Sequence, residues 1–179
     1  MHNFVIKLFT KMKRRQILTL IFGVIALAIN VLIIVESCIN GEGSSSQSLG
    51  FTNMIVNILE KIFPNTPITE DREQLHAIVR KLFGHFLLFG LSGIFTTLTL
   101  LVRLENPHKK DWIINGSISA GIGLTIAAIS EFIQAFQPGR AGLPSDVLID
   151  FSGYLLFGSI VFVIYMLVYY KISSKKETR

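Results

Sequence analysis

The chain has 179 residues, of which 50% are hydrophobic and 16% charged, with a mean hydropathy of +0.54 and a formal net charge of +5. Its single cysteine, Cys38, excludes an intrachain disulfide, and no nucleic-acid-binding motif accompanies the positive charge. The charged residues are grouped and leave long apolar windows, so the composition also excludes an ordinary soluble domain, in which each helix has a polar face.

Four apolar windows predict four membrane-spanning helices, at residues 17–35, 83–102, 112–136 and 147–170. Each window is close to the roughly 20 residues that a helix needs to cross about 30 Å of hydrocarbon. None shows the strict alternation of a half-buried strand. We therefore expect an all-α membrane protein, a four-helix transmembrane bundle whose first helix covers residues 17–36.

A basic segment, residues 1–16, precedes the first window. A secretory signal peptide also begins with charged residues, but its apolar core is shorter and a small-residue cleavage site follows it. This window is longer and has no such site after it. We interpret it as a membrane anchor, with a cleaved or lipidated leader as the alternative.

The distribution of lysine and arginine predicts which way the bundle faces. Segments 1–16, 103–111 and 171–179 carry 12 of these residues, and segments 37–82 and 138–146 carry the other five of the 17. Cytoplasmic loops are enriched in lysine and arginine. We therefore expect both termini, including the basic tail at 171–179, in the cytoplasm, with membrane lipids as partners.

The outer loop at residues 37–82 contains helical patterns of its own. Residues 41–50 are rich in glycine and serine and are expected to form a flexible linker. Residues 53–63 have apolar side chains at helical spacing and predict an amphipathic helix, which either lies on the outer membrane surface or packs as a lid over the bundle. A further helix is expected to start near Thr66 or Thr69 and to continue without a break into the second span.

Polar side chains are predicted to gather at the outer ends of the last three spans. The second helix enters from outside, the third runs outward and the fourth returns, so their outer ends come together. The candidate functional cluster is Lys81, His85, Glu131, Gln134, Arg140, Asp146 and Asp150. An ionised side chain at a helix centre costs about 2.5–3.5 kcal/mol on insertion scales, so such residues are functional candidates.

Each of these residues also has a structural interpretation. Asp146 or the preceding serine could cap the fourth helix, and Arg140 could pair with lipid phosphates from its turn. His85 could be a hydrogen-bonded packing residue, and Gln134 could bond a neighbouring backbone. Only the convergence of the whole set favours a functional site.

Two motifs on adjacent helices carry a resemblance to a known family. They are Arg80-Lys81, Gly84-His85-Phe86 and Phe89 in the first, and Glu131-x-x-Gln134, Pro138-Gly139-Arg140, Asp146 and Asp150-x-x-Gly153 in the second. Over a core at residues 83–170, and roughly from residue 75, the chain resembles the VanZ-like bacterial membrane proteins. The resemblance implies a multi-pass protein of the bacterial plasma membrane, and the namesake is associated with teicoplanin resistance. Asp150 stands where many family members have asparagine.

The resemblance and the polar cluster together favour a binding protein of the cell envelope. The cluster would hold the headgroup of a lipid-linked cell-wall precursor or of a lipoglycopeptide, with Glu131 and Arg140 at its centre. Arg140 and Lys81 would face phosphates. We expect no cofactor and no resident metal ion, and leave open a homo-oligomer.

A membrane enzyme acting on a lipid-linked cell-wall precursor is the alternative. In it, His85 would act as a general base, and Glu131 with Asp150 would hold a divalent cation. No dedicated catalytic motif such as HExxH supports this alternative. A proton relay ranks third, because the inner halves of the spans lack acids and histidines.

Overall fold

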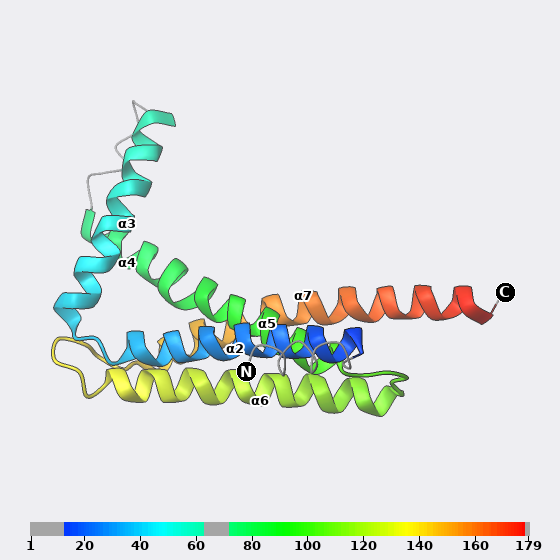
Figure 1. Ribbon diagram of the computed structural model, residues 1–179. Coiled ribbons are helices and arrows are strands. Elements are labelled where there is room, and N and C mark those ends of the chain that lie inside the picture. Colours follow the sequence, from blue (N-terminus) through cyan, green and yellow to red (C-terminus); the bar gives the residue numbers. More distant parts are fainter. Residues whose placement is uncertain (1–12, 63–71, 178–179) are drawn as a thin grey trace, which may run out of the picture.

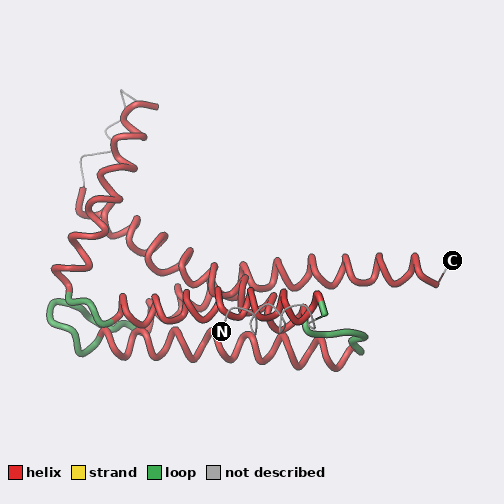
Figure 2. Tube along the Cα trace, viewed as in Figure 1, coloured by secondary structure: helices red, strands yellow, loops and turns green. Residues whose placement is uncertain are grey.

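The computed structural model describes residues 13–62 and 72–177, and every regular element within these ranges is a helix. In chain order they are α2 (Arg14–Ser37), α3 (Gly41–Ile62), α4 (Arg72–Val79), the π-helical η1 (Arg80–Leu87), α5 (Leu88–Val102), α6 (Lys109–Gln134) and α7 (Pro144–Glu177). Helices α2, α5, α6 and α7 form an elongated bundle, and α3 with α4 projects from one of its ends (Figures 1 and 2). The expected all-α fold is confirmed.

Four helices are long and apolar enough to cross a membrane: Arg14–Ser37, Leu75–Val102, Lys109–Gln134 and Pro144–Ser174. Their outer faces carry large apolar side chains that are more than half exposed, such as those of Leu27, Ile113 and Leu148. Such surfaces are unfavourable in water but not in hydrocarbon. The four-span membrane architecture predicted from hydropathy is therefore confirmed.

One buried residue from each span meets in the core of the bundle. These are Ile33 of α2, Phe89 of α5, Ala127 of α6 and Tyr154 of α7. The ring of Tyr154 lies against Gly123, where an added Cβ would come within 2.4 Å of the ring. Small residues let membrane helices approach closely, and here glycine makes room for the tyrosine.

Polar side chains inside the bundle bond to one another between helices. The Ser119 hydroxyl on α6 lies 2.8 Å from the Thr97 hydroxyl on α5 and 3.1 Å from the Tyr154 hydroxyl on α7. Ser92 donates to the side-chain oxygen of Asn30 on α2 at 2.5 Å. Because hydrocarbon offers no partners, these bonds satisfy groups that would otherwise be costly to bury.

The expectation of a flexible linker at residues 41–50 is wrong, because this segment is the first half of α3. Its start is anchored: the backbone N–H of Gly41 donates to the Pro138 carbonyl at 2.9 Å, and that of Gly43 donates to the Asn40 side chain. The Ser48 hydroxyl bonds back to the carbonyl of Ser44, one turn earlier. These bonds offset the poor helix propensity of glycine and serine. The expected amphipathic helix forms the second half of α3, with residue 63 outside the described residues.

Helices α4, η1 and α5 follow one another without a break from Arg72 to Val102, as the sequence predicts for one long helix. The expected start near residue 66 or 69 lies outside the described ranges. The π-helical turn at Arg80–Leu87 was not predicted. Helix α7 is also longer than expected, since the basic tail is helical as far as Glu177.

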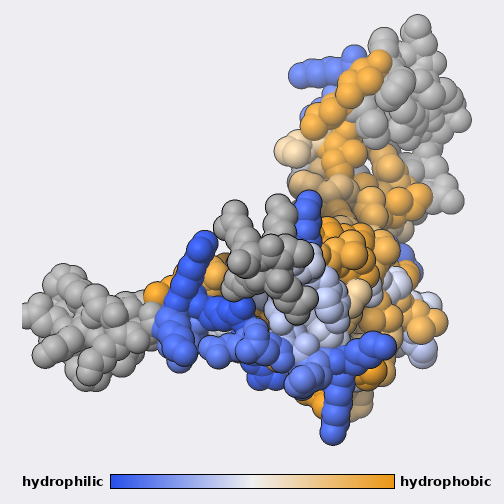
Figure 3. Space-filling model, turned by 90° about the vertical axis from the view of Figure 1, so that its right-hand side faces the viewer, coloured by the Kyte–Doolittle hydropathy of each residue, from blue (hydrophilic) through white to orange (hydrophobic). Residues whose placement is uncertain are grey.

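The start of α2 and the loop between α5 and α6 lie at one end of the bundle, where the Arg15 guanidinium donates to the Leu104 carbonyl. The end of α7 extends in the same direction (Figure 1). Seen from this end, hydrophilic residues gather over the end of the bundle, and hydrophobic residues cover much of the rest of the visible face (Figure 3). The loop between α6 and α7 contacts the start of α3 at the opposite end. Which end faces the cytoplasm stays a prediction.

Candidate functional site

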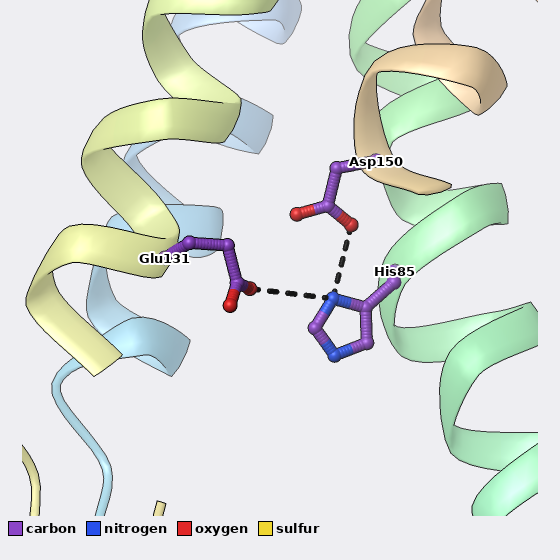
Figure 4. Close-up of side chains that lie close together, drawn as sticks. All are labelled: His85, Glu131 and Asp150. Atoms are coloured by element: carbon purple, nitrogen blue, oxygen red, sulfur yellow. Dashed lines mark hydrogen bonds and ion pairs between the residues drawn. The ribbon is translucent and has the colours of Figure 1, made fainter. Parts of the chain in front are cut away.

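Three buried ionisable side chains, His85 of η1, Glu131 of α6 and Asp150 of α7, meet between the helices and are called the buried triad (Figure 4). The Nδ1 atom of His85 lies 2.9 Å from Oδ1 of Asp150 and 3.7 Å from Oε1 of Glu131. The exposed fractions of the three residues are 7%, 3% and 0% in chain order. Two carboxylates thus lie close to one imidazole, and all three groups are buried.

Parallel packing of η1 on α7 positions two of these residues. One turn before the His85–Asp150 pair, the Lys81 ammonium donates to Asp146 at 2.7 Å. Both pairs are separated by 65 positions, so one turn along η1 matches one turn along α7. Gly153 permits this contact, since an added Cβ there would lie 2.1 Å from the carbonyl oxygen of Phe86.

The loop after α6 holds the third member of the triad. Oε2 of Glu131 accepts a bond of 3.1 Å from the backbone N–H of Leu143, and Oε1 accepts one of 2.8 Å from the Gln134 amide. The loop folds back closely at Gly142, where an added Cβ would be 2.1 Å from the Glu131 carbonyl oxygen. Glu131 is therefore fixed in orientation by donors outside the triad.

Only one of the two carboxylate oxygens of Asp150 has a hydrogen-bond partner among the described residues. Its Oδ1 atom faces the His85 imidazole, whereas its buried Oδ2 atom has no hydrogen-bond partner among the described residues. Burying a carboxylate oxygen without a partner is unfavourable by about 1–3 kcal/mol, and by more when it is charged. The triad therefore contains one oxygen, Oδ2 of Asp150, that can still accept a bond.

Arg140 and Glu131, which were expected together at the centre of the cluster, do not bond to each other. The Arg140 guanidinium donates instead to the carbonyl of Glu36 in the last turn of α2, at 2.8 Å, and to that of Ile39 just after the helix, at 3.2 Å. The last carbonyls of a helix lack partners within it and attract a cation, so they compete successfully for this side chain. Burial and the charge of Arg80 lower the pKa of Arg140, while the charges of Glu131 and Glu36 act in the opposite direction.

A cavity of about 410 Å³, called the arginine cavity, opens beside the triad. Its polar lining includes Arg80, Arg140, His85, Gln134, Glu36, Ser44 and Ser48, and its apolar lining includes Leu32, Phe51 and Phe83. The Nε atom of Arg80 is buried with no hydrogen-bond partner in the described part of the chain. Helix α3 closes one side, where the Ser48 hydroxyl lies 2.7 Å from Nε2 of His76.

The seven predicted site residues thus divide into three groups. His85, Gln134 and Arg140 line the cavity, and Glu131 and Asp150 contact His85. Lys81 and Asp146 pair with each other and are not among the residues that line the cavity.

Sequence reasoning missed Arg80, Glu36 and Ser48 as cavity residues. Arg80 had a signal, because it precedes Lys81 in the basic pair of the first motif. Ser48 belongs to the segment that was expected to be a flexible linker. No pattern in the sequence distinguished Glu36 from other residues at the end of a membrane helix.

Comparison with known proteins places the chain in a family. The model of the VanZ/LLP1 family matches residues 20–169, which include most of each span, the buried triad and the arginine cavity. The same comparisons found no similar curated protein and no similar solved structure. Since the match covers most of the chain, the resemblance seen in the two motifs is confirmed: this membrane protein belongs to the VanZ/LLP1 family.

Proposed function

We propose that this protein binds the anionic headgroup of an envelope lipid-linked precursor, or of a lipoglycopeptide antibiotic, in the arginine cavity and so contributes to teicoplanin resistance. The observation that carries the proposal is the presence of two guanidinium groups, of Arg80 and Arg140, in one cavity between membrane spans. Guanidinium groups bind phosphates and carboxylates through paired hydrogen bonds.

The charges around the cavity favour an anionic ligand. Arg80 is close enough to Arg140 for the two like charges to act against each other, and its buried Nε donor is unused among the described residues. An anion between the two side chains would relieve the repulsion and accept that hydrogen bond. It would also leave Arg140 free to keep its bonds to the end of α2.

The apolar part of the lining favours a ligand that carries a lipid chain. Leu32 and Phe83 line the cavity and are partly exposed, at 46% and 38%. A headgroup could therefore occupy the polar part of the cavity while its chain lies along these apolar side chains. Positive charge at the opposite end of the bundle supports an outer-leaflet location for the cavity.

Binding can be measured with purified protein in nanodiscs and a polyprenyl-diphosphate-linked precursor, with the neutral polyprenyl alcohol as the control ligand. Arg80→Gln and Arg140→Gln are each expected to weaken binding at least tenfold, about 1.4 kcal/mol. The matched control is Lys109→Gln, which removes an exposed charge at the other end of the bundle. Equal affinity of all four proteins, or equal binding of the neutral alcohol, would contradict the proposal.

The cellular test is teicoplanin susceptibility at equal amounts of membrane-inserted protein. Arg140→Ala, His85→Ala and Glu131→Gln are expected to reduce resistance towards that of cells without the protein, and Lys109→Gln is expected to retain it. Full resistance in all three variants would make the cluster structural.

A second candidate function is an enzyme that acts on the same lipid-linked class of molecule. The observation that favours it is His85, which lines the cavity and is hydrogen-bonded to Asp150 at 2.9 Å. An imidazole oriented by a carboxylate is the arrangement of a general base. Chromatography of the precursor after incubation separates the two functions, because turnover would support the enzyme and saturable binding without a product would support the binder.

A further inference from the structure

We propose that the buried triad is a binding site for a divalent transition-metal ion of the Zn²⁺ or Mn²⁺ class. This site goes beyond headgroup binding and does not depend on it, since it uses His85, Glu131 and Asp150 rather than the two arginines. It also departs from the expectation, drawn from the sequence, that the protein holds no resident metal.

The geometry of the triad suits one small cation. The three residues each offer a ligand atom, and these atoms lie within 4.8 Å of one another. Two of the separations are 2.9 and 3.7 Å, both measured from Nδ1 of His85. Ligand atoms about 2.0–2.2 Å from a tetrahedral Zn²⁺ are roughly 3.3–3.6 Å apart, so small side-chain movements would complete the site.

An unused acceptor at the same place is the second observation. Asp150 is fully buried, and its Oδ2 atom has no hydrogen-bond partner among the described residues. The donors of Gln134 and Leu143 hold the Glu131 carboxylate, as outer partners hold the ligands in metal sites. The carboxylate of Glu131 is thus already held in one orientation, and that of Asp150 has an oxygen available to bind a cation.

The charges of the buried triad also favour a bound cation. Among the described residues, only His85 comes within ion-pair distance of Glu131 or Asp150. Two nearby cations have other partners, since Lys81 pairs with Asp146 and Arg140 bonds the end of α2, and Arg80 forms no ion pair with either carboxylate among the described residues. A dication would neutralise the two carboxylates while the imidazole stays uncharged, which avoids an unbalanced buried charge.

The donor set selects the class of metal. Imidazole nitrogen suits Zn²⁺ and its first-row neighbours, whereas Ca²⁺ and Mg²⁺ take mainly oxygen ligands. Three protein ligands also leave a coordination position for water or for an oxygen of a substrate, as in catalytic zinc sites. Because His85 lines the arginine cavity, the ion would lie beside an anion bound there.

The test is metal binding by the purified full-length protein in detergent. After treatment with a chelator and equilibration with Zn²⁺ or Mn²⁺, elemental analysis and calorimetry give the stoichiometry and affinity. We expect one ion per chain for the unaltered protein with at least one of the two metals. Glu131→Gln, Asp150→Asn and His85→Ala are each expected to weaken binding at least tenfold.

Matched controls separate this site from adventitious binding. His76→Ala removes a histidine outside the triad, and Asp146→Asn removes an acid one turn from Asp150; both should bind the ion as the unaltered protein does. Glu131→Gln and Asp150→Asn preserve side-chain shape, and circular dichroism checks that they fold. The proposal is overturned if neither metal binds, which would leave a triad that shares protons, or if the triad variants bind as tightly as the controls.

The metal site and the headgroup site can fail separately. Arg80→Gln should retain the ion while losing the precursor, because Arg80 contributes to the cavity and not to the triad. A protein that binds Zn²⁺ or Mn²⁺ but no precursor would refute only the proposed function. The reverse result would refute only the metal site.

Discussion

The Asp150 carboxylate has the most constrained surroundings of any side chain in the site. It is fully buried, one of its oxygens faces His85 and the other has no partner among the described residues. In the metal-free protein it lies close to a second buried carboxylate, that of Glu131. An acid at this position is therefore costly to the fold, and its presence needs a compensating function.

We predict that Asp150→Asn stabilises the metal-free protein. The change removes a buried charge and keeps an oxygen that can accept the hydrogen bond from His85, so the free energy of unfolding should rise by about 1 kcal/mol or more. Asp146→Asn is the contrasting variant and should lower it, because Asp146 pairs with Lys81 at 2.7 Å.

Thermal unfolding in chelator, followed by circular dichroism, measures both changes. A lower midpoint of thermal unfolding for Asp150→Asn than for the unaltered protein would contradict this prediction. It would show that other groups of the protein compensate the charge of Asp150 without a metal ion.

Helix α7 is the element around which the bundle packs closely. Gly93 of α5 lies against its backbone, where an added Cβ would be 2.3 Å from the Tyr154 carbonyl oxygen. Gly153 of α7 makes an equally close contact with the carbonyl of Phe86. Such approaches between backbones stabilise membrane helices through van der Waals contact, and they set the distance between η1 and α7 that the triad requires.

We predict that Gly93→Ala destabilises the bundle by about 1–3 kcal/mol, because the new methyl group would force α5 and α7 apart. Gly121→Ala on α6 is the matched control, since nothing lies within 4 Å of the position of its added Cβ. Midpoints of thermal unfolding in the same detergent compare the two. Equal midpoints would mean that the helices separate at little cost.

The direction of the whole molecule in the membrane remains a prediction from basic residues. In a Cys38→Ser background, a cysteine at Leu143 would lie in the α6–α7 loop and one at Glu105 in the α5–α6 loop, both at exposed positions. A membrane-impermeant maleimide should label position 143 in intact cells and position 105 only after permeabilisation. The opposite pattern would place the arginine cavity on the cytoplasmic side.

The sequence by itself determined the four spans, the helical class and the family. Span length follows from bilayer thickness, and the lipid-facing surface must be apolar, so local composition suffices to locate the helices. Alternating direction of the spans also indicated that Glu131 and Asp150 lie near the same end as His85. These inferences need no knowledge of how the helices are rotated about their axes.

Only the tertiary structure decided which partner each polar side chain takes. Arg140 bonds the end of α2 rather than Glu131, and residues 41–50 form a helix because Gly41 is anchored to the Pro138 carbonyl. The His85–Asp150 contact depends on the close approach at Gly153, between residues about 65 positions apart. Hydropathy and motif spacing do not encode helix rotation or separation, and these set the distances over which hydrogen bonds and ion pairs form.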